Sequence, residues 1–363
     1  MAETFIKIDK LLNVMNKPKV LVFGNFNYST NNLCGQTVKT RNVYQLLKSK
    51  ENQYFSEVAF FDTDSLNANK LGLFQGLYHV IKADELFYLP ATKNLTYIFP
   101  FIFILSKLFA AKIHFVVVGG WLAEYLKHKP IHRFMMSKIE MIYPETDALC
   151  NCLTMDYGFN KVRRLNNFRD TNFSPVQSAT GNPIKLVFMA RVHPLKGVET
   201  LFKLSQRLKE LNFENVSIDI YGPIFEEYKE EFNNLLNTAI KNIKYRGVLQ
   251  PNEIYLVLSQ YDIMLFPTQF YTEGFPGSIL DAYISGIPVV ASNWMYASEF
   301  VEQTSGAIVE FNNVDAFINK VLTLIENPEQ IDALKQGARA KSHEFSSDKA
   351  WEVIKSITFP IKQ

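Results

Sequence analysis

Two cations stand shortly after an apolar segment in the second half of the chain. Residues 184–189 have the composition of a buried strand, and Arg191 and Lys196 follow it, ahead of a helix expected over 198–211. Arginine grips phosphate with a fork of N–H donors, and lysine supplies a movable positive charge. Because cations oppose the dipole at a helix N-terminus, the arrangement favours an anionic ligand over two solvated charges.

A glycine-containing loop with two carboxylates follows the strand expected over 262–266. It reads Glu273-Gly-Phe-Pro-Gly-Ser-Ile-Leu-Asp281. Glycines let a backbone approach a ligand closely, and the helix that follows directs N–H groups to the same place. Asp281 lies about two turns beyond Glu273 on a similar side, so the pair suits hydroxyl groups at two ends of an elongated ligand. By itself the segment equally fits a tight turn before a well-capped helix.

Two weaker turn signals follow other predicted strands. Gly222-Pro223 ends the strand expected over 216–221, and Arg246-Gly247-Val248 ends a further short strand. All four features therefore fall at the carboxyl edge of one predicted parallel sheet, where ligands bind in folds of this kind. Their coincidence predicts a single binding site.

The elements that must position these residues alternate between strands and helices. Strands are expected over 19–24, 58–61, 114–118, 184–189, 216–221, 262–266 and 288–291, and the polar segment 170–183 has the composition of a linker. We predict an α/β fold of two doubly wound parallel-sheet domains, 1–170 and 171–345, facing across a cleft. The final helix, 346–363, is expected to pack back on the first domain.

Composition narrows the class of protein. A chain of 363 residues with 47% hydrophobic content fits two globular domains and excludes disordered or collagen-like chains. Its 38 Lys and Arg against 36 Asp and Glu leave +2, so we expect no nucleic-acid partner. Three cysteines cannot build a disulfide framework, which favours a reducing, cytoplasmic location.

The sequence predicts neither a metal site nor a secretory signal. Cys150 and Cys152 lack a second ligand pair, and the six histidines have no metal-ligand spacing. The segment 1–10 has no continuous apolar core, so it does not resemble a secretory signal.

One apolar stretch needs a separate interpretation. Residues 95–120 are interrupted by Pro100, Lys107 and Lys112, and spanning a bilayer takes about 20 predominantly apolar residues. We predict a buried helix before the strand at 114–118; the alternative is a surface that dips into a membrane. The basic stretch 127–138 is expected to be a solvated face, or else to contact anionic lipid or an acceptor pyrophosphate.

The second half resembles the retaining nucleotide-sugar glycosyltransferases of family 4, which have the GT-B fold of two Rossmann-like domains. The resemblance runs in order and spacing over roughly half of the chain. It is carried by Arg191 with Lys196, Gly247-Val248 and the segments 261–268, 273–281 and 286–292. The first half matches more loosely, through segments 20–23, 35–40 and 118–122.

This resemblance implies a metal-independent, retaining hexosyl transfer from a nucleotide-diphosphate sugar, with a UDP-sugar favoured and no other cofactor. Arg191 and Lys196 would bind the diphosphate and neutralise charge on the leaving group, and Glu273 would hydrogen-bond the donor sugar. These three are the implied catalytic residues.

The resemblance also implies a wider donor site. The amides of Gly274, Phe275, Gly277 and Ser278 would line the sugar and the phosphates. Asp281 would hold the ribose, the Val248 backbone would meet the base beside Gly222, and Gly35 would close on the phosphates from the first domain. These implied residues are Gly35, Gly222, Val248, Gly274, Phe275, Gly277, Ser278 and Asp281.

Two departures from the family pattern stand out. Asp281 is one methylene shorter than the usual glutamate, which puts the strength of ribose binding in doubt. Many relatives carry a histidine at the carboxyl end of a first-domain strand, where this chain has Gly119-Gly120-Trp121. We expect these three to help seat the acceptor, and His114 to be structural.

The resulting functional expectation is transfer to a saccharide acceptor, taken as lipid-linked, in capsular, exo- or other surface polysaccharide biosynthesis. The protein would be cytoplasmic, with peripheral contact on an anionic inner membrane face. Two alternatives stay open: an inactive GT-B-like partner that stabilises another glycosyltransferase, and a sugar-nucleotide epimerase.

Overall fold

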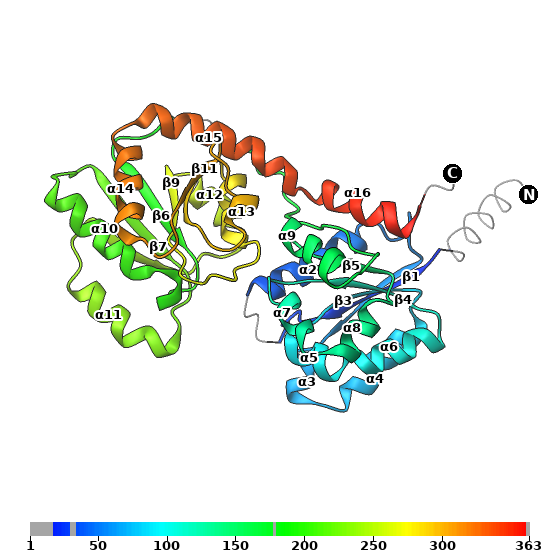
Figure 1. Ribbon diagram of the computed structural model, residues 1–363. Coiled ribbons are helices and arrows are strands. Elements are labelled where there is room, and N and C mark those ends of the chain that lie inside the picture. The colour runs from blue at the N-terminus through cyan, green and yellow to red at the C-terminus, as the bar shows by residue number, and fades with distance from the viewer. Residues whose placement is uncertain (1–16, 30–33, 177–178, 361–363) are drawn as a thin grey trace, which may run out of the picture. The chain divides into compact units, whose positions relative to one another are not determined.

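The computed structural model describes residues 17–29, 34–176 and 179–360, so the first ten residues, where no secretory signal is expected, lie outside it (Figure 1). The chain forms two compact units: one ends at Asp170 and resumes at Ser347, and the other runs from Thr171 to Ser346. Each unit is a parallel sheet covered by helices on both faces. The predicted α/β fold class of two doubly wound parallel-sheet domains is therefore confirmed.

The sheet of the first unit has the order β2-β1-β3-β4-β5, with every pairing parallel. Its strands are β1 (Lys19–Gly24), β2 (Glu57–Asp62), β3 (Glu85–Leu89), β4 (Lys112–Val116) and β5 (Met141–Tyr143). The strand expected over 114–118 begins and ends two residues earlier, and β3 and β5 were not singled out from the sequence. His114 is buried inside β4, where its ring nitrogens lie 2.7 Å from the Glu85 carboxylate and 3.1 Å from the Tyr143 hydroxyl, in keeping with a structural role.

Helices cover the two faces of this sheet unequally. One face packs against α2 and α16, with Leu46, Leu47, Trp351 and Ile354 buried there. The other face carries α4 to α8 and the segment after β5. The helices of the unit are α2 (Gly35–Lys48), α3 (Ser65–Ala68), α4 (Gly72–Lys82), α5 (Thr92–Tyr97), α6 (Phe99–Leu108), α7 (Leu122–Lys127), α8 (Pro130–Met136), α9 (Asp147–Asn151), a π-helical turn (Cys152–Asp156) and α16 (Ser347–Thr358).

The prediction of a buried helix is wrong for the apolar stretch after residue 95. It forms α5 and α6, and α6 buries only one side, with Phe99 and Ile102 inward. Phe101, Ile104 and Leu108 are more than half exposed. No helix among the described residues is both long and apolar enough to span a bilayer.

The second unit has the strand order β11-β10-β9-β6-β7-β8, again all parallel. Its strands are β6 (Ile184–Met189), β7 (Val216–Tyr221), β8 (Ile243–Gly247), β9 (Ile263–Phe266), β10 (Val289–Ser292) and β11 (Gly306–Val309). The chain builds outward from β6 to β8, then returns to lay β9 on the opposite side of β6. The carboxyl ends of β6 and β9 therefore form the topological switch point at which ligands bind in such sheets.

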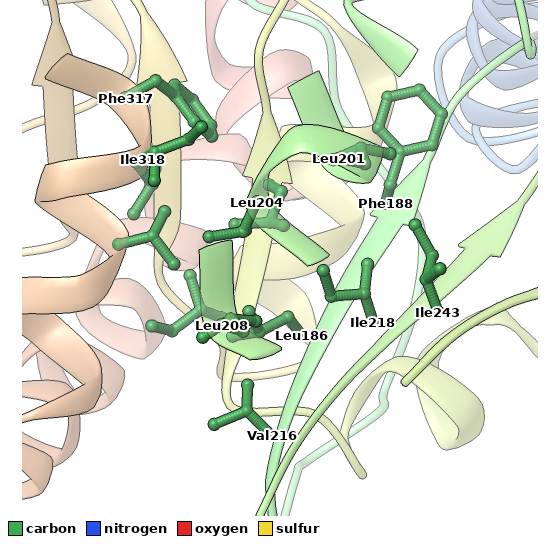
Figure 2. Packing of buried hydrophobic residues seen from close by; sticks show 14 of the residues in the cluster. Leu186, Phe188, Leu201, Leu204, Leu208, Val216, Ile218, Ile243, Phe317 and Ile318 are labelled. Carbon is green, nitrogen blue, oxygen red and sulfur yellow. The ribbon is translucent and has the colours of Figure 1, made fainter. Parts of the chain in front are cut away.

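Leucines at helical spacing hold the second sheet to its helices. Figure 2 shows Leu201, Leu204 and Leu208 of α10 packed over Leu186 and Ile218 of neighbouring strands. Full burial of each such side chain contributes about 1.5–3 kcal/mol. The helices are α10 (Val198–Glu210), α11 (Lys229–Asn237), α12 (Ile254–Leu258), α13 (Gly277–Ile284), α14 (Val314–Ile325) and α15 (Pro328–Ser342), with 3-10 turns at Pro194–Lys196, Glu226–Tyr228, Ala297–Glu299 and His343–Phe345.

Candidate functional site

The loop after β6 places Arg191 and Lys196 at the switch point of the second unit. Arg191 is exposed, and Lys196 ends a one-turn 3-10 helix that leads into α10. The backbone of Val192 between them donates to Pro223 (2.9 Å), which ties this loop to the one after β7. Both cations therefore project from a fixed backbone at the carboxyl edge of the sheet.

A glycine brings the loops after β6 and β9 into contact. Gly197 has φ +72°, and a Cβ there would overlap the carbonyl oxygen of Pro267. Next to it, the amide of Gln269 donates to the carbonyl of Leu195 at 2.8 Å. Only glycine allows both the left-handed backbone and this approach. The contact places Lys196 beside the segment that carries Glu273.

Lys196 and Glu273 form an ion pair across these two loops. Their side chains are 24% and 14% exposed, and the Lys196 ammonium also lies about 6 Å from the ring centres of Phe266 and Phe270. Burial, together with the positive charge of Arg191, lowers the pKa of Lys196 to about 8. A bound anion such as a diphosphate would offset both the burial of Lys196 and the repulsion from Arg191. A lysine with a lowered pKa at a sheet edge is therefore a candidate for an anion-binding residue.

The segment after Glu273 leads into the N-terminus of α13. Gly274 and Phe275 lie in the loop, and Gly277 and Ser278 are the first residues of the helix. Phe275 anchors the loop, because its ring stacks on Phe300 with centroids 4.0 Å apart. The backbone of this loop is thus held in place beside Lys196 and Glu273.

Asp281 lies farther inside than the sequence suggested. It occupies the fifth position of α13 and is only 5% exposed. Its buried position means that a hydroxyl group would have to approach closely against the helix to meet this carboxylate.

Gly222 and Val248 lie at the same edge, after β7 and at the end of β8. Gly222 has φ +136°, and a Cβ there would overlap the carbonyl oxygen of Ala190 in the loop that carries Arg191. Its amide donates to the carbonyl of Gly247 at 2.9 Å, and Val248 is 55% exposed. The structure therefore brings together Arg191, Lys196, Gly222, Val248, Glu273 and the start of α13 on one sheet edge.

A polar cluster behind this edge was not predicted. The Tyr261 hydroxyl donates to Asp219 (2.8 Å), and Arg246 Nε donates to the same carboxylate (2.9 Å). The hydroxyls of Tyr261 and Tyr221 are 3.0 Å apart, and burial raises the pKa of Tyr261 well above its usual range. The cluster fixes the strand ends that precede Gly222 and Gly247. The signal in the sequence was Asp219, a carboxylate between two isoleucines of a predicted strand.

The remaining predicted residues lie in the first unit. Gly35 is the exposed first residue of α2. Gly119, Gly120 and Trp121 follow β4, with Gly119 at φ +81° and the Trp121 indole N–H donating to the carbonyl of Val118 (2.7 Å). These residues also lie at the carboxyl edge of their sheet. The roles that the resemblance assigns to them stay predictions.

A buried ion pair that sequence analysis missed supports the Gly119 turn. Lys39 of α2 is 1% exposed, and its ammonium lies 2.6 Å from the Glu145 carboxylate after β5. Lys39 also donates to the carbonyl of Val117 (2.8 Å), and the amide of Gly119 donates to Glu145 (3.3 Å). Burial lowers the pKa of Lys39, against the effect of the Glu145 charge.

Metal ligands do not gather in the part of the chain that is described: no three His, Cys, Asp or Glu side chains there are placed to share an ion. No disulfide bond joins Cys34, Cys150 or Cys152 to another described cysteine.

Comparison with known sequences points to one family for the second unit. Residues 170–341, a little under half of the chain, match the family model described as "Glycosyl transferases group 1". A relative in Corynebacterium glutamicum, a GDP-mannose-dependent monoacylated alpha-(1-6)-phosphatidylinositol monomannoside mannosyltransferase, is 25% identical over 170 residues, which are 46% of this chain and 43% of the relative. The matched segment thus spans less than half the length of the curated relatives.

Solved structures extend the likeness to nearly the whole chain. Anabaena HepE, solved in complex with UDP, superposes with a TM-score of 0.74 at 15% identity, over 94% of this chain and 100% of that protein. Sucrose-phosphate synthase from Thermosynechococcus elongatus gives a TM-score of 0.71 at 10% identity, over 94% and 98%. At such identities the likeness shows the fold, and that fold is GT-B.

Proposed function

We propose that this chain is a retaining glycosyltransferase that moves a sugar from a nucleotide-diphosphate sugar, with a UDP-sugar favoured, to an acceptor hydroxyl. The observation that carries the proposal is the meeting of Arg191, Lys196 and Glu273 at the switch point of the second sheet. The match of residues 170–341 to the group 1 glycosyl transferases covers all three residues and supports the same activity.

Charge neutralisation is the first part of the mechanism. As the bond between the sugar C1 and the diphosphate oxygen breaks, negative charge grows on the leaving group. Arg191 offers forked N–H donors and Lys196 a point charge at the site where that charge develops. In this scheme the two side chains supply the positive charge, without a metal ion.

The Lys196–Glu273 pair is the resting arrangement of the site. When a donor binds, the ammonium turns to the diphosphate and the carboxylate accepts from sugar hydroxyls, so each group exchanges one charged partner for another. Because neither group is left buried without a partner, the exchange avoids the cost of an uncompensated charge.

Bond making completes the transfer without a covalent intermediate. The acceptor oxygen bonds to C1 on the face from which the diphosphate leaves, and the acceptor proton passes to the departing phosphate oxygen. Glu273 holds the sugar in place meanwhile, and the backbone from Gly274 to Ser278 lines the sugar and phosphates.

Asp281 would meet the ribose, and Val248 beside Gly222 would meet the base. Gly35 would contribute to phosphate binding from the first unit.

The acceptor we propose is a lipid-linked saccharide in surface polysaccharide assembly, seated with the help of Gly119, Gly120 and Trp121. Support comes from the exposed apolar side chains of α6, which lie in a cation-rich surface. The name of the Corynebacterium glutamicum relative, which specifies a phosphatidylinositol mannoside, points to the same class of acceptor.

Two rival functions predict different outcomes. An inactive stabilising partner is favoured by Asp281, which is shorter than the family's glutamate and deeply buried. The paired Lys196 and Glu273 argue against it, because a degenerate site has no reason to keep two part-buried charges. A sugar-nucleotide epimerase would consume a donor and form no acceptor product.

A product analysis separates these functions. The protein is incubated with UDP-, GDP- and dTDP-sugars and a lipid-linked saccharide, and the new linkage is assigned by NMR. We expect one donor to be used and its anomeric configuration to be kept; Lys196→Ala should lose the activity, and the exposed Lys203→Ala on α10 should keep it. An inverted linkage contradicts retention, and donor turnover without a linked product favours the epimerase.

A further inference from the structure

Helices α4, α6 and α8 form a layer on one face of the first unit's sheet (Figure 1). Val80, Ile102 and Met135, one from each helix, are buried in the same apolar core. The Lys107 ammonium of α6 donates to the carbonyl of Lys138 just after α8 (2.7 Å), which links the two helices directly. The outer side of the layer is therefore one continuous surface of three helices.

The outer side of α6 is apolar at regular helical spacing. Phe101, Ile104 and Leu108 are 56%, 56% and 71% exposed, whereas Phe99 and Ile102 are buried. Because residues three and four apart share a helix face, these three side chains form one stripe. A helix that is apolar on its outer as well as its inner side has a second surface to cover.

The two neighbouring helices also carry exposed apolar side chains. Phe74 and Tyr78 of α4 are 70% and 52% exposed, and Phe134 of α8 is 60% exposed. Large apolar side chains exposed on three adjoining helices are typical of an interaction site in soluble proteins. We call this surface the outer patch, comprising Phe74, Tyr78, Phe101, Ile104, Leu108 and Phe134.

Cations outnumber carboxylates around the outer patch, although Lys112 pairs with Glu85 (3.0 Å) and Lys127 with Glu124 (2.8 Å). Segments 65–83, 90–112 and 125–139, which contain the three helices and their flanks, hold no Asp or Glu, although the chain as a whole has 36 in 363 residues. The same segments hold nine Lys or Arg: Lys70, Lys82, Lys93, Lys107, Lys112, Lys127, Lys129, Arg133 and Lys138. Aromatic and apolar side chains among exposed cations match the interface of an anionic bilayer, where rings enter the headgroup region and ammonium groups meet phosphates.

We infer that the outer patch docks this protein on an anionic phospholipid surface, lying in the interface without spanning it. The inference deepens the proposed function and rests on it for the lipid-linked acceptor, which such docking would bring to the enzyme. The cations also lie near the patch rings: the Lys82 ammonium is 4.5 Å from the Tyr78 ring centre and that of Lys138 is 5.9 Å from Phe134. They are therefore placed to reach headgroups when the rings enter the interface.

A second copy of the chain fits this surface less well. A two-fold contact of the outer patch with itself would bring the cations of one copy, which outnumber the carboxylates around the patch, against those of the other. Like charges brought together across an interface oppose association. An anionic bilayer supplies the missing charge as well as the apolar medium.

The test measures partition of the full-length protein to vesicles by co-sedimentation. Vesicles of phosphatidylcholine alone are compared with vesicles containing about one third phosphatidylglycerol, at low and high salt. We expect binding to the anionic vesicles, weaker binding at high salt, and little binding to phosphatidylcholine alone.

Two variants of the patch carry the prediction. Phe101→Asn/Ile104→Asn/Leu108→Asn removes the apolar stripe, and Lys82→Glu/Lys93→Glu/Lys138→Glu reverses three exposed cations. Each is expected to reduce partition at least about tenfold, since each cation near an anionic surface and each buried methylene contribute separately. The matched controls, Leu256→Asn and Lys203→Glu/Lys209→Glu/Lys241→Glu, change exposed residues of the second unit and should bind as wild type.

Three outcomes would overturn the inference. These are no binding to anionic vesicles at low salt, equal binding by patch and control variants, and a dimer in solution that the Asn variant dissociates. Nucleotide binding to the donor site, measured on the same samples, is expected to be unchanged in every variant. If wild type binds nucleotide but does not bind anionic vesicles, the result counts against the outer patch and leaves the proposed function standing. Absence of nucleotide binding in wild type counts against the proposed function.

Discussion

The ammonium of Lys196 contacts the carboxylate of Glu273 across two loops that follow the neighbouring strands β6 and β9. The contact depends on Gly197, whose missing side chain leaves room for Pro267. Two opposite charges are thus kept together at the carboxyl edge of a parallel sheet, part-buried and beside a second cation, Arg191. A nucleotide-diphosphate sugar carries the anion and the hydroxyl groups that would separate this pair.

Replacing the two partners singly should divide donor binding from the transfer step. Lys196→Ala removes a charge that faces the diphosphate in both the ground state and the transition state, so we expect nucleotide affinity and kcat to fall together. Glu273→Gln keeps the shape but weakens hydrogen bonds to sugar hydroxyls, so kcat should fall at least about tenfold while UDP affinity is largely kept. Steady-state kinetics and calorimetry measure the two quantities. Wild-type turnover in either variant would contradict the assignment.

The lowered pKa of Lys196 predicts opposite pH effects on stability and on binding. Its folded pKa of about 8 lies below the ordinary 10.5, so the folded protein loses this proton before the unfolded chain does. The contribution of Lys196 should therefore raise the free energy of unfolding as the pH rises from 8 towards 10.5. UDP affinity should fall over the same range, because the folded protein loses the positive charge that binds the diphosphate. Both trends should be absent from Lys196→Met, so they should appear in the difference between wild type and this variant.

Glu273 offers a second check on this pH dependence. Its carboxylate favours the charged form of Lys196, so Glu273→Gln should move the fall in UDP affinity to lower pH. Calorimetric titrations from pH 6.5 to 10 follow the change. A shift in the other direction would show that the ion pair does not govern the titration of Lys196.

Gly197 should resist substitution more than its backbone angle alone requires. An alanine in left-handed backbone costs about 1–2 kcal/mol, and at Gly197 its Cβ would also overlap the Pro267 carbonyl. Gly158→Ala is the matched control, because Gly158 has a similar φ of +68° and nothing within 4 Å of its Cβ position. We expect Gly197→Ala to lower both the Tm and UDP affinity, and Gly158→Ala to lower the Tm only slightly. Equal effects would mean that the loop contact is not needed.

The buried Lys39–Glu145 pair should be a structural support of the first unit. Lys39→Met removes the ammonium that the buried Glu145 carboxylate contacts, which typically costs about 3–5 kcal/mol. Lys39→Met/Glu145→Gln should recover part of that loss. Urea unfolding in a Trp294→Phe background isolates the signal of the first unit, which holds Trp121 and Trp351. If the single variant is as stable as wild type, the pair does not support the Gly119 turn.

Sequence analysis was most accurate where apolar strands are bounded by turn residues. The strands over 19–24, 184–189 and 216–221 have the predicted bounds, because a strand covered on both faces is mostly apolar along its length. β5 has only three residues and carries no such pattern. The partial exposure of α6 was hidden for the opposite reason: its exposed side is as apolar as its buried side, and only the packing shows which residues face outward.

Some residues of the candidate site could be predicted from the sequence, and others could not. Arg191, Lys196 and Glu273 were found because each follows a strand, and parallel strands bring their carboxyl ends to one edge. The Lys39–Glu145 pair and the Asp219 cluster were missed because their partners are far apart in the sequence and meet only through the order of strands in the sheet. Individual glycines gave a usable signal at turns, but the close approaches at Gly197 and Gly222 are visible only in the structure.

The most direct measurement is a thermal-shift panel with UDP, GDP, ADP, CDP and dTDP on wild type, Lys196→Ala and Lys203→Ala. A ligand at 100 times its Kd stabilises the folded state by about 2.7 kcal/mol, which is readily detected. We predict that one nucleotide, with UDP favoured, raises the Tm of wild type and Lys203→Ala and fails to do so for Lys196→Ala. If no nucleotide raises the Tm of wild type, or if Lys196→Ala responds equally, the donor site is not where Lys196 and Glu273 meet.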